Sequence, residues 1–292
     1  MIPCLFVSDL HGALARYRVL FRVVAAEKPA AVLFGGDLLP FLGYQWGESD
    51  LSPERFFGDF LIPELRILRH ELGDAYPRML IILGNDDPAT AVTALESCEQ
   101  EHLCEHIHGK SVSLAGFHVL GYACVPPTPF LHKDWERYDV SRYVDPGCVS
   151  PEEGFRTIPV SPSRLRHGTI ARDLEGLLRQ LDPARTVLLS HAPPYRTGLD
   201  RAGLDGRSHD GVPVDPHIGS VAVRRFIEAH QPWLALHGHV HESARITGMW
   251  HDTIGRTPTI SAAHDGPDLA IVRFDLEHPE EACRELLPCP GK

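Results

Sequence analysis

The sequence predicts an α/β fold, with some α+β character, in which two β-sheets pack face to face and helices cover their outer faces. In the first third of the 292-residue chain, apolar runs alternate with segments of helical spacing, which indicates βαβ units and a largely parallel sheet. Later in the chain, short apolar runs follow one another closely, as antiparallel strands do. Two stacked sheets accommodate both patterns.

The alternating pattern begins at the N-terminus. Its elements are predicted at 2–7 (strand), 13–26 (helix), 31–34 (strand), 53–72 (helix) and 79–83 (strand). The second helix is placed by Pro53, which suits a first helical turn, and by Leu61, Leu65 and Leu68, which fall on one face.

The second pattern starts with a hairpin over 111–120, where two short runs flank Ala115-Gly116. Buried strands are then predicted at 187–189 and 233–236, with a helix over 220–230 between them. After residue 241 we expect three antiparallel strands, at 244–246, 257–261 and 269–274.

Two long segments lack a regular pattern. Residues 125–166, called the cap segment below, contain seven prolines and several aromatic side chains, and residues 193–217 are rich in glycine, proline and aspartate. Loops of this length in a compact domain usually act as lids or substrate loops. We therefore expect one domain over 1–292 with these two segments as insertions.

Composition excludes several classes of protein. A hydrophobic content of 43% and a charged content of 23% are ordinary for a soluble globular chain. The formal charge of −11 gives no global field that would attract long nucleic acid. No apolar stretch approaches the roughly 18 residues that cross a bilayer. Neither long nucleic acid nor a membrane is expected as a partner, and the oligomeric state stays open.

The cysteines and the N-terminus indicate the compartment. The chain runs from Met1 directly into an apolar strand, without the basic segment that precedes an export signal. Seven cysteines, an odd number without a Cys-x-x-Cys pair, argue against a disulfide framework or a zinc ribbon. Reduced thiols and a cytoplasmic location are expected.

Seven potential metal ligands occur in five short pieces, four of which follow an apolar run. They are Asp9, His11, Asp37, Asn85, His191, His239 and His241. Imidazoles, carboxylates and a carboxamide on loops suit borderline divalent cations such as Mn, Fe, Zn or Ni. Asp9 and His11, two residues apart, would point the same way on an extended strand end.

Read singly, most of these pieces also have a structural interpretation. Asp37 could cap a helix or a turn, and Asn85 could serve turn chemistry. A lone histidine such as His191 is often only a hydrogen-bonding group. The segment Gly238-His239-Val240-His241 is the strongest single indication of a site, while the preceding His237 suits a structural role.

The order of the pieces changes this balance. Asp-x-His, Gly-Asp, Gly-Asn-Asp, a lone His and Gly-His-x-His, each at a strand end, resemble the calcineurin-like metallophosphoesterase superfamily over residues 2 to about 247. The resemblance implies an αββα sandwich of two mixed sheets, with metals at their carboxyl edges. It assigns one ion to Asp9, His11, Asp37 and His241, and another to Asp37, Asn85, His191 and His239, with Asp37 bridging.

One position departs from the family pattern. Asp86 stands where the family usually has a histidine that stabilises charge or protonates the leaving group. Asp86 could donate a proton only if its pKa rose well above about 3.9, which nearby cations oppose. We therefore expect weaker activity on esters with poor leaving groups, with Asp86 as the candidate catalytic residue. Its alternatives are a ligand hydrogen bond or a helix cap.

The resemblance implies a hydrolase with two divalent ions, Mn as first choice, in which a metal-activated hydroxide attacks a phosphate ester. The substrate is expected to be a small phosphodiester or phosphomonoester, possibly nucleotide-like, with mono- or diester preference open. Asn85, Arg207, His209 and His217 are candidate substrate contacts. The stretch 155–172 holds four arginines and no acidic residue, so it could contact phosphate or form a solvated face. The alternative function is a non-catalytic scaffold that binds metal or phosphate.

Overall fold

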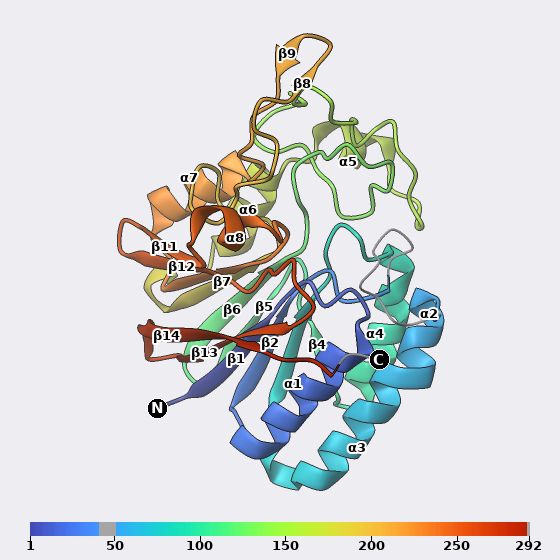
Figure 1. Cartoon of the computed structure of the whole chain (residues 1–292), viewed down its shortest axis with the longest axis vertical. Helices are drawn as coiled ribbons and strands as arrows, with labels where there is room; N and C mark the ends of the chain where they lie inside the picture. Colours follow the sequence, from blue (N-terminus) through green and yellow to red (C-terminus); the bar gives the residue numbers. More distant parts are fainter. Residues whose placement is uncertain (41–50, 291–292) are drawn as a thin grey trace.

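The computed structural model describes residues 1–40 and 51–290. Two six-stranded mixed sheets face each other, and helices cover their outer faces (Figure 1). Strand β2 of one sheet contacts β7 of the other, and β3 contacts β6. The predicted α/β architecture with two stacked mixed sheets is confirmed.

The first sheet has the strand order β14-β13-β1-β2-β3-β4. Its parallel part consists of β1 (Pro3–Val7), β2 (Ala31–Gly35), β3 (Arg78–Ile82) and β4 (Glu105–His106). Strands β13 (Leu269–Asp275) and β14 (His278–Leu287) extend it in the antiparallel sense. The strands β1, β2 and β3 are almost wholly buried, as expected for a parallel sheet covered on both faces.

The second sheet has the order β11-β12-β10-β7-β6-β5. Its strands are β5 (Ser111–Leu114), β6 (Phe117–Tyr122), β7 (Thr186–Ser190), β10 (Leu234–His237), β11 (His251–Ile254) and β12 (Thr257–Ser261). The hairpin β5–β6 is confirmed, and its turn has positive φ at Ala115 and Gly116, as a tight hairpin turn requires. The central strands β6, β7, β10 and β12 are parallel.

Helices lie on both outer faces. Helices α1 (Leu14–Glu27), α3 (Ile62–Leu72) and α4 (Val92–Gln100) lie beside the first sheet, and α6 (Ile170–Leu178) and α7 (Val221–His230) lie beside the second (Figure 1). The remaining helices are α2 (Pro53–Phe56), α5 (Pro162–His167) and α8 (Ser243–Thr247), with single π or 3₁₀ turns at Phe57–Leu61, Gly73–Ala75, Ala89–Ala91 and Pro183–Arg185.

The helix expected over 53–72 is interrupted. A π-helical turn over Phe57–Leu61 separates α2 from α3, and Pro63 follows directly in the first turn of α3. Proline has no N–H to donate and its ring crowds the preceding turn, so a wider turn before it avoids the clash. The rings of Phe56 and Phe60 pack on Tyr17 of α1, with centroids 5.3 and 5.8 Å apart.

Two expectations for the C-terminal third were wrong. Residues 244–246 form part of helix α8 instead of a strand, and Gly248 (φ 75°) ends this helix in the left-handed conformation. A three-residue apolar run is too short to distinguish the two states. Strand β12 is antiparallel only to β11 and runs parallel to β10, because α8 and β11 supply the crossover.

The cap segment has little regular structure. Isolated bridges join Val125 to Glu136 and His132 to Phe155, and α5 begins near its end. All seven cysteines are free thiols. Within residues 1–40 and 51–290, no helix has the length and apolarity to cross a membrane.

Candidate metal centre

All seven predicted ligands lie on loops that leave strands at one edge of the stacked sheets. Strands β1, β2 and β3 lead to Asp9 and His11, to Asp37, and to Asn85, whereas β7 and β10 lead to His191 and to the His239–His241 pair. Parallel strands end at a common edge, so residues over 200 positions apart in sequence meet there.

The backbone of these loops is unusual. Asp9, His11, Asp37 and His239 have φ of 56°, 45°, 52° and 74°, the left-handed region that non-glycine residues rarely occupy. The expectation that Asp9 and His11 sit on an extended strand end was therefore wrong, because β1 ends at Val7. Backbone bonds from Asp9 N to Gly36 O and from His11 N to Asp37 O, both 2.9 Å, join this loop to the Asp37 loop.

One cluster contains Asp9, His11, Asp37 and His241. One candidate ligand atom from each lies within 4.8 Å of the others, and all four residues are buried. His241 Nε2 lies 3.0 Å from Asp9 Oδ1 and 3.0 Å from His11 Nε2. These atoms converge on a small volume, as cation ligands do.

A second cluster contains Asp37, His191 and His239 within the same 4.8 Å limit. His191 Nε2 lies 3.2 Å from Asp37 Oδ2 and 3.2 Å from Asn85 Oδ1. His191 Nδ1 lies 2.7 Å from Gly35 O, so a proton on Nδ1 would be donated to this carbonyl and leave Nε2 free to bind a cation. Asp37 belongs to both clusters.

Two glycines permit this close approach. A Cβ on Gly84 would lie 2.3 Å from Asp37 Oδ1, and a Cβ on Gly238 would lie 2.6 Å from Asp9 Oδ2. Any side chain at these positions would fill space that the ligand atoms occupy. The Gly-Asn and Gly-His dipeptides of the sequence thus have a steric basis.

The electrostatics favour cations. Burial opposes the charge of Asp37, but the neighbouring His191 outweighs burial and holds the pKa of Asp37 below its usual range. Burial also opposes the charge of His191, but Asp37 raises its pKa to about 10. At His11 and His239 burial dominates and lowers the pKa to about 4 and about 3. Neutral His11 and His239 beside ionised Asp37 are in the states that ligate metal. A bound cation would displace the proton that Asp37 favours on His191, so the donor set fits divalent cations.

Asp86 lies at the rim of the two clusters. Its backbone N donates to Asp37 Oδ1 over 2.8 Å, and its side-chain Oδ1 accepts from Asn85 Nδ2 over 2.9 Å. Oδ2 lies 3.8 Å from His11 Nδ1. Burial and the charge of Asp37 raise the pKa of Asp86 to about 8, whereas bound cations would act in the opposite direction.

Asp87 is a site residue that sequence reasoning missed. Its buried carboxylate accepts the N–H groups of Leu38, Leu39 and Gly84 over 2.8 to 3.1 Å. It therefore joins the loop after Asp37 to the loop that carries Asn85. The only sequence signal was its place in a Gly-Asn-Asp-Asp-Pro turn.

The three candidate substrate contacts of the 193–217 segment belong to neither cluster. Arg207 and His209 are exposed at the hairpin of β8 (Ser208–His209) and β9 (Val212–Pro213), which projects at one end of the molecule (Figure 1). His217 Nδ1 lies 2.8 Å from Asp200 Oδ1. His237, expected to be structural, has Nδ1 within 3.1 Å of the Ser190 and Ala192 carbonyls.

A pocket of about 260 Å³ adjoins the first cluster at His11 and His241. Sequence reasoning missed its other lining residues, which are Arg16, Gly203, Glu242, Arg245, His264 and Asp265. Arg16 Nη1 donates to Asp9 O over 2.8 Å, and Arg245 pairs with Asp265 over 2.6 Å. No sequence signal separated these basic groups from ordinary surface residues.

Comparisons with solved structures bear on the fold. No protein of curated function matches the chain in sequence. One solved structure superposes with a TM-score of 0.61 at 18% identity, covering 98% of this chain and 99% of the other. The protein TT1561 of Thermus thermophilus gives 0.57 at 16%, again covering 98% and 99%. A dimetal phosphatase from Danio rerio gives 0.48 at 14%, covering 93% and 91%. At such identities the likeness concerns the fold alone.

The family of the chain is shown by its sequence. The profile of the calcineurin-like phosphoesterases matches residues 2–243, which include every one of the seven candidate ligands. This family uses divalent metals, in agreement with the two clusters of potential ligands. The chain therefore belongs to the calcineurin-like phosphoesterase family.

Proposed function

We propose that this protein hydrolyses a small phosphate ester at a centre of two divalent cations. The observation that carries the proposal is the position of Asp37 in both ligand clusters of a phosphoesterase-family chain. Asp9, His11, Asp37 and His241 would hold one cation. Asp37, Asn85, His191 and His239 would hold the other, and Mn²⁺ is our first choice for both.

The bound cations would lower the pKa of a water and neutralise charge on the phosphoryl oxygens. The residues of the chain position these groups. Asp37 supplies negative charge to both clusters, and the Gly35 carbonyl fixes the ring of His191. Asp86, beside Asn85, stands where the family usually has a histidine, and we propose that its carboxylate is a weak proton donor.

The pocket beside His11 and His241 supports a small substrate. Its volume of about 260 Å³ lies just below the usual range of ligand pockets, and its lining combines Arg16 and Arg245 with Glu242 and Asp265. We also propose Arg207, His209 and His217 as substrate contacts. We also propose that the chain forms a single domain and that the protein is cytoplasmic.

The test pairs metal analysis with two esters. Metal content of the purified protein after Mn²⁺ loading is measured by mass spectrometry, alongside hydrolysis of bis-p-nitrophenyl phosphate and p-nitrophenyl phosphate. About two metals per chain with turnover of at least one ester is expected. Two bound metals without turnover of either ester would overturn the proposal in favour of a non-catalytic scaffold.

The role of Asp86 has its own test. Replacing it in an Asp86→His variant should raise turnover of alkyl phosphate esters, which have poor leaving groups, more than turnover of p-nitrophenyl esters. General acid catalysis typically contributes about 10²- to 10⁴-fold, and the effect is largest where the leaving group needs a proton. Equal changes for both classes of ester would show that position 86 does not handle the leaving-group proton.

A further inference from the structure

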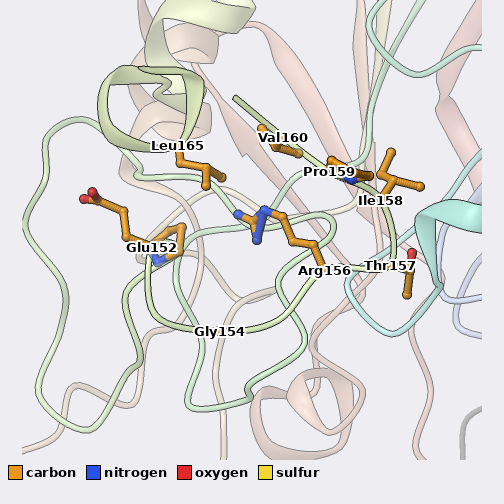
Figure 2. A pocket seen from close by; sticks show the side chains of 9 residues that line it. Glu152, Gly154, Arg156, Thr157, Ile158, Pro159, Val160 and Leu165 are labelled. Carbon is orange, nitrogen blue, oxygen red and sulfur yellow. The ribbon is translucent and has the colours of Figure 1, made fainter. Parts of the chain in front are cut away.

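The cap segment forms an open pocket that the metal centre does not use. It has a volume of about 290 Å³ and is lined by residues between Pro151 and Leu165. Figure 2 shows the guanidinium of Arg156 among these residues, with Ile158, Pro159, Val160 and Leu165 around it. The pocket thus combines one cationic group with apolar walls.

Arg156 has no counter-ion in the described part of the chain. Its side chain makes no hydrogen bond or ion pair with residues 1–40 or 51–290, and its Nη1 is buried without an acceptor. Burial lowers the pKa of the Arg156 guanidinium. Arg156 as a whole is half-buried, but its Nη1 is a buried polar atom without an acceptor, and leaving such an atom without a hydrogen bond is costly.

The acidic groups near Arg156 are already engaged. Asp134 accepts hydrogen bonds from Ala89 N and from the backbone and side chain of Thr157. Glu136 is paired with the buried Lys133 over 2.6 Å.

Glu152, on the pocket wall, is engaged elsewhere as well. Its carboxylate accepts from Tyr138 Oη and pairs with Arg142 and Arg166. In Figure 2 it points away from the Arg156 guanidinium. None of the three neighbouring carboxylates forms a hydrogen bond or an ion pair with Arg156, although the charge of Asp134 opposes the effect of burial on its pKa.

Arginines are frequent in this part of the cap segment. Residues 155–172 contain four arginines, Arg156, Arg164, Arg166 and Arg172, and no acidic residue. The nearest acidic residues before this stretch are Glu152 and Glu153. Among the nearby charged groups, Asp134 raises the pKa of Arg156 and Arg137 lowers it. An anion entering the pocket would supply the acceptor that Nη1 lacks.

We propose that this pocket binds a small monocarboxylate with a short apolar body. The planar guanidinium of Arg156 would pair with the carboxylate through two parallel N–H···O bonds. The apolar body would lie against Ile158, Val160 and Leu165. A phosphate fits less well, because a dianion with three oxygens needs more donors than one guanidinium among apolar walls provides. The site is independent of the proposed phosphoesterase activity.

The test uses isovalerate, a branched monocarboxylate, titrated calorimetrically into the metal-loaded full-length protein. Isovalerate should bind the wild type, and an Arg156→Gln variant should bind it at least tenfold more weakly. Arg225→Gln, which removes an exposed arginine on α7, should bind like the wild type. The neutral isovaleramide should not bind measurably.

Three results would overturn the proposal. They are equal binding to Arg156→Gln, equal binding of isovaleramide, and displacement of isovalerate by inorganic phosphate at a lower concentration than by a second monocarboxylate. Hydrolysis of bis-p-nitrophenyl phosphate by the variant, relative to wild type, reports that its metal centre is intact.

Thermal stability separates binding from a structural role. A structural arginine would lower the Tm when replaced, whereas an unpaired cation kept for binding should leave it unchanged or raise it on Arg156→Met substitution. Isovalerate should raise the Tm of the wild type but not of Arg156→Met. A fall in Tm of several degrees in the variant without ligand would show that Arg156 stabilises the fold and would contradict the proposal.

Discussion

The metal centre and the cap segment differ in what fixes the positions of their polar side chains. At the metal centre the ligands follow buried parallel strands, whose pairing fixes where each loop begins. In the cap segment, which has few strand pairs, carboxylates hold the backbone. Asp134 accepts two backbone N–H groups, and Glu136 accepts one while pairing with Lys133.

This difference has a consequence for mutation. Loss of a metal ligand removes a functional group from a framework that the strands hold independently. Loss of a cap carboxylate, or of its partner, removes the hydrogen bonds and ion pairs that hold the backbone of the cap segment in place. We therefore expect variants at the metal centre to change activity with little effect on the unfolding free energy of the metal-free protein, and variants in the cap to do the reverse.

The largest effect is expected for Asp37→Ala, because Asp37 belongs to both clusters. Metal-assisted catalysis is worth several kcal/mol, so turnover of bis-p-nitrophenyl phosphate should fall by more than about 10³-fold. Metal content should fall as well. Asp74→Ala, at an exposed carboxylate, should match the wild type. Activity that survives with both metals retained would show that Asp37 does not bridge.

The cap should respond to loss of the Lys133–Glu136 pair. Lys133 is fully buried, and its Nζ donates to Glu136 and to the Thr128 carbonyl. Lys133→Met leaves a buried carboxylate unpaired and should lower the free energy of unfolding by about 3–5 kcal/mol, measured with urea. The double variant Lys133→Met/Glu136→Leu removes both charges and should recover most of this loss.

Metal content is the second measurement for the cap variants. It should equal that of the wild type in both, and Lys110→Met, at a half-exposed lysine, should change neither quantity. If Lys133→Met lost metal without losing stability, the two regions would not be independent.

The comparison also explains what could be predicted from sequence. Strands at 2–7, 31–34, 79–83 and 187–189 are continuous apolar runs, and burial of such runs follows from composition alone. The ligands were found because they follow these strands. By contrast, β14 (HPEEACRELL) is an edge strand with mostly polar side chains, and no apolar pattern marked it.

Other features depend on contacts between distant residues. The pair Lys133–Glu136, the three N–H groups at Asp87 and the pocket residues Arg245 and His264 acquire their roles only when the chain is folded. A single sequence carries no local signal for them. The left-handed backbone at Asp9 and His11 is similarly imposed by the joined loops.

An intermediate effect is expected for Asp87, which touches no predicted cation position but joins two ligand loops. Asp87→Ala should weaken Mn²⁺ binding about 10- to 100-fold, because groups that orient ligands typically contribute this much. Competition with a fluorescent chelator measures the affinity. Asp87→Asn keeps one carbonyl acceptor and should lose less. Unchanged affinity in Asp87→Ala would mean that the strands alone fix the loops.

The smallest effect concerns His108, where the second sheet meets the cap segment. Its ring packs on Trp135 of the cap with centroids 4.9 Å apart, and its Nδ1 accepts from Ala123 N over 2.9 Å. Burial, then the charges of His106 and the arginines Arg137 and Arg164, lower its pKa to about 3. Protonation of Nδ1 would replace this hydrogen bond by a repulsive contact between the Nδ1–H of His108 and the N–H of Ala123.

Because the pKa of His108 is lower in the folded state than the ordinary value near 6.5, the unfolded chain takes up its proton first as pH falls. The neutral ring contributes stability that is present above about pH 6.5 and is lost below it, at up to about 1.4 kcal/mol per pH unit.

His108→Gln keeps an acceptor for Ala123 N but does not titrate. Between pH 7 and pH 5 its unfolding free energy, measured with urea, should fall about 1–2 kcal/mol less than that of the wild type. His70→Gln, at an exposed histidine, should follow the wild type. Parallel pH curves for all three proteins would show that acid acts elsewhere than at this contact between sheet and cap.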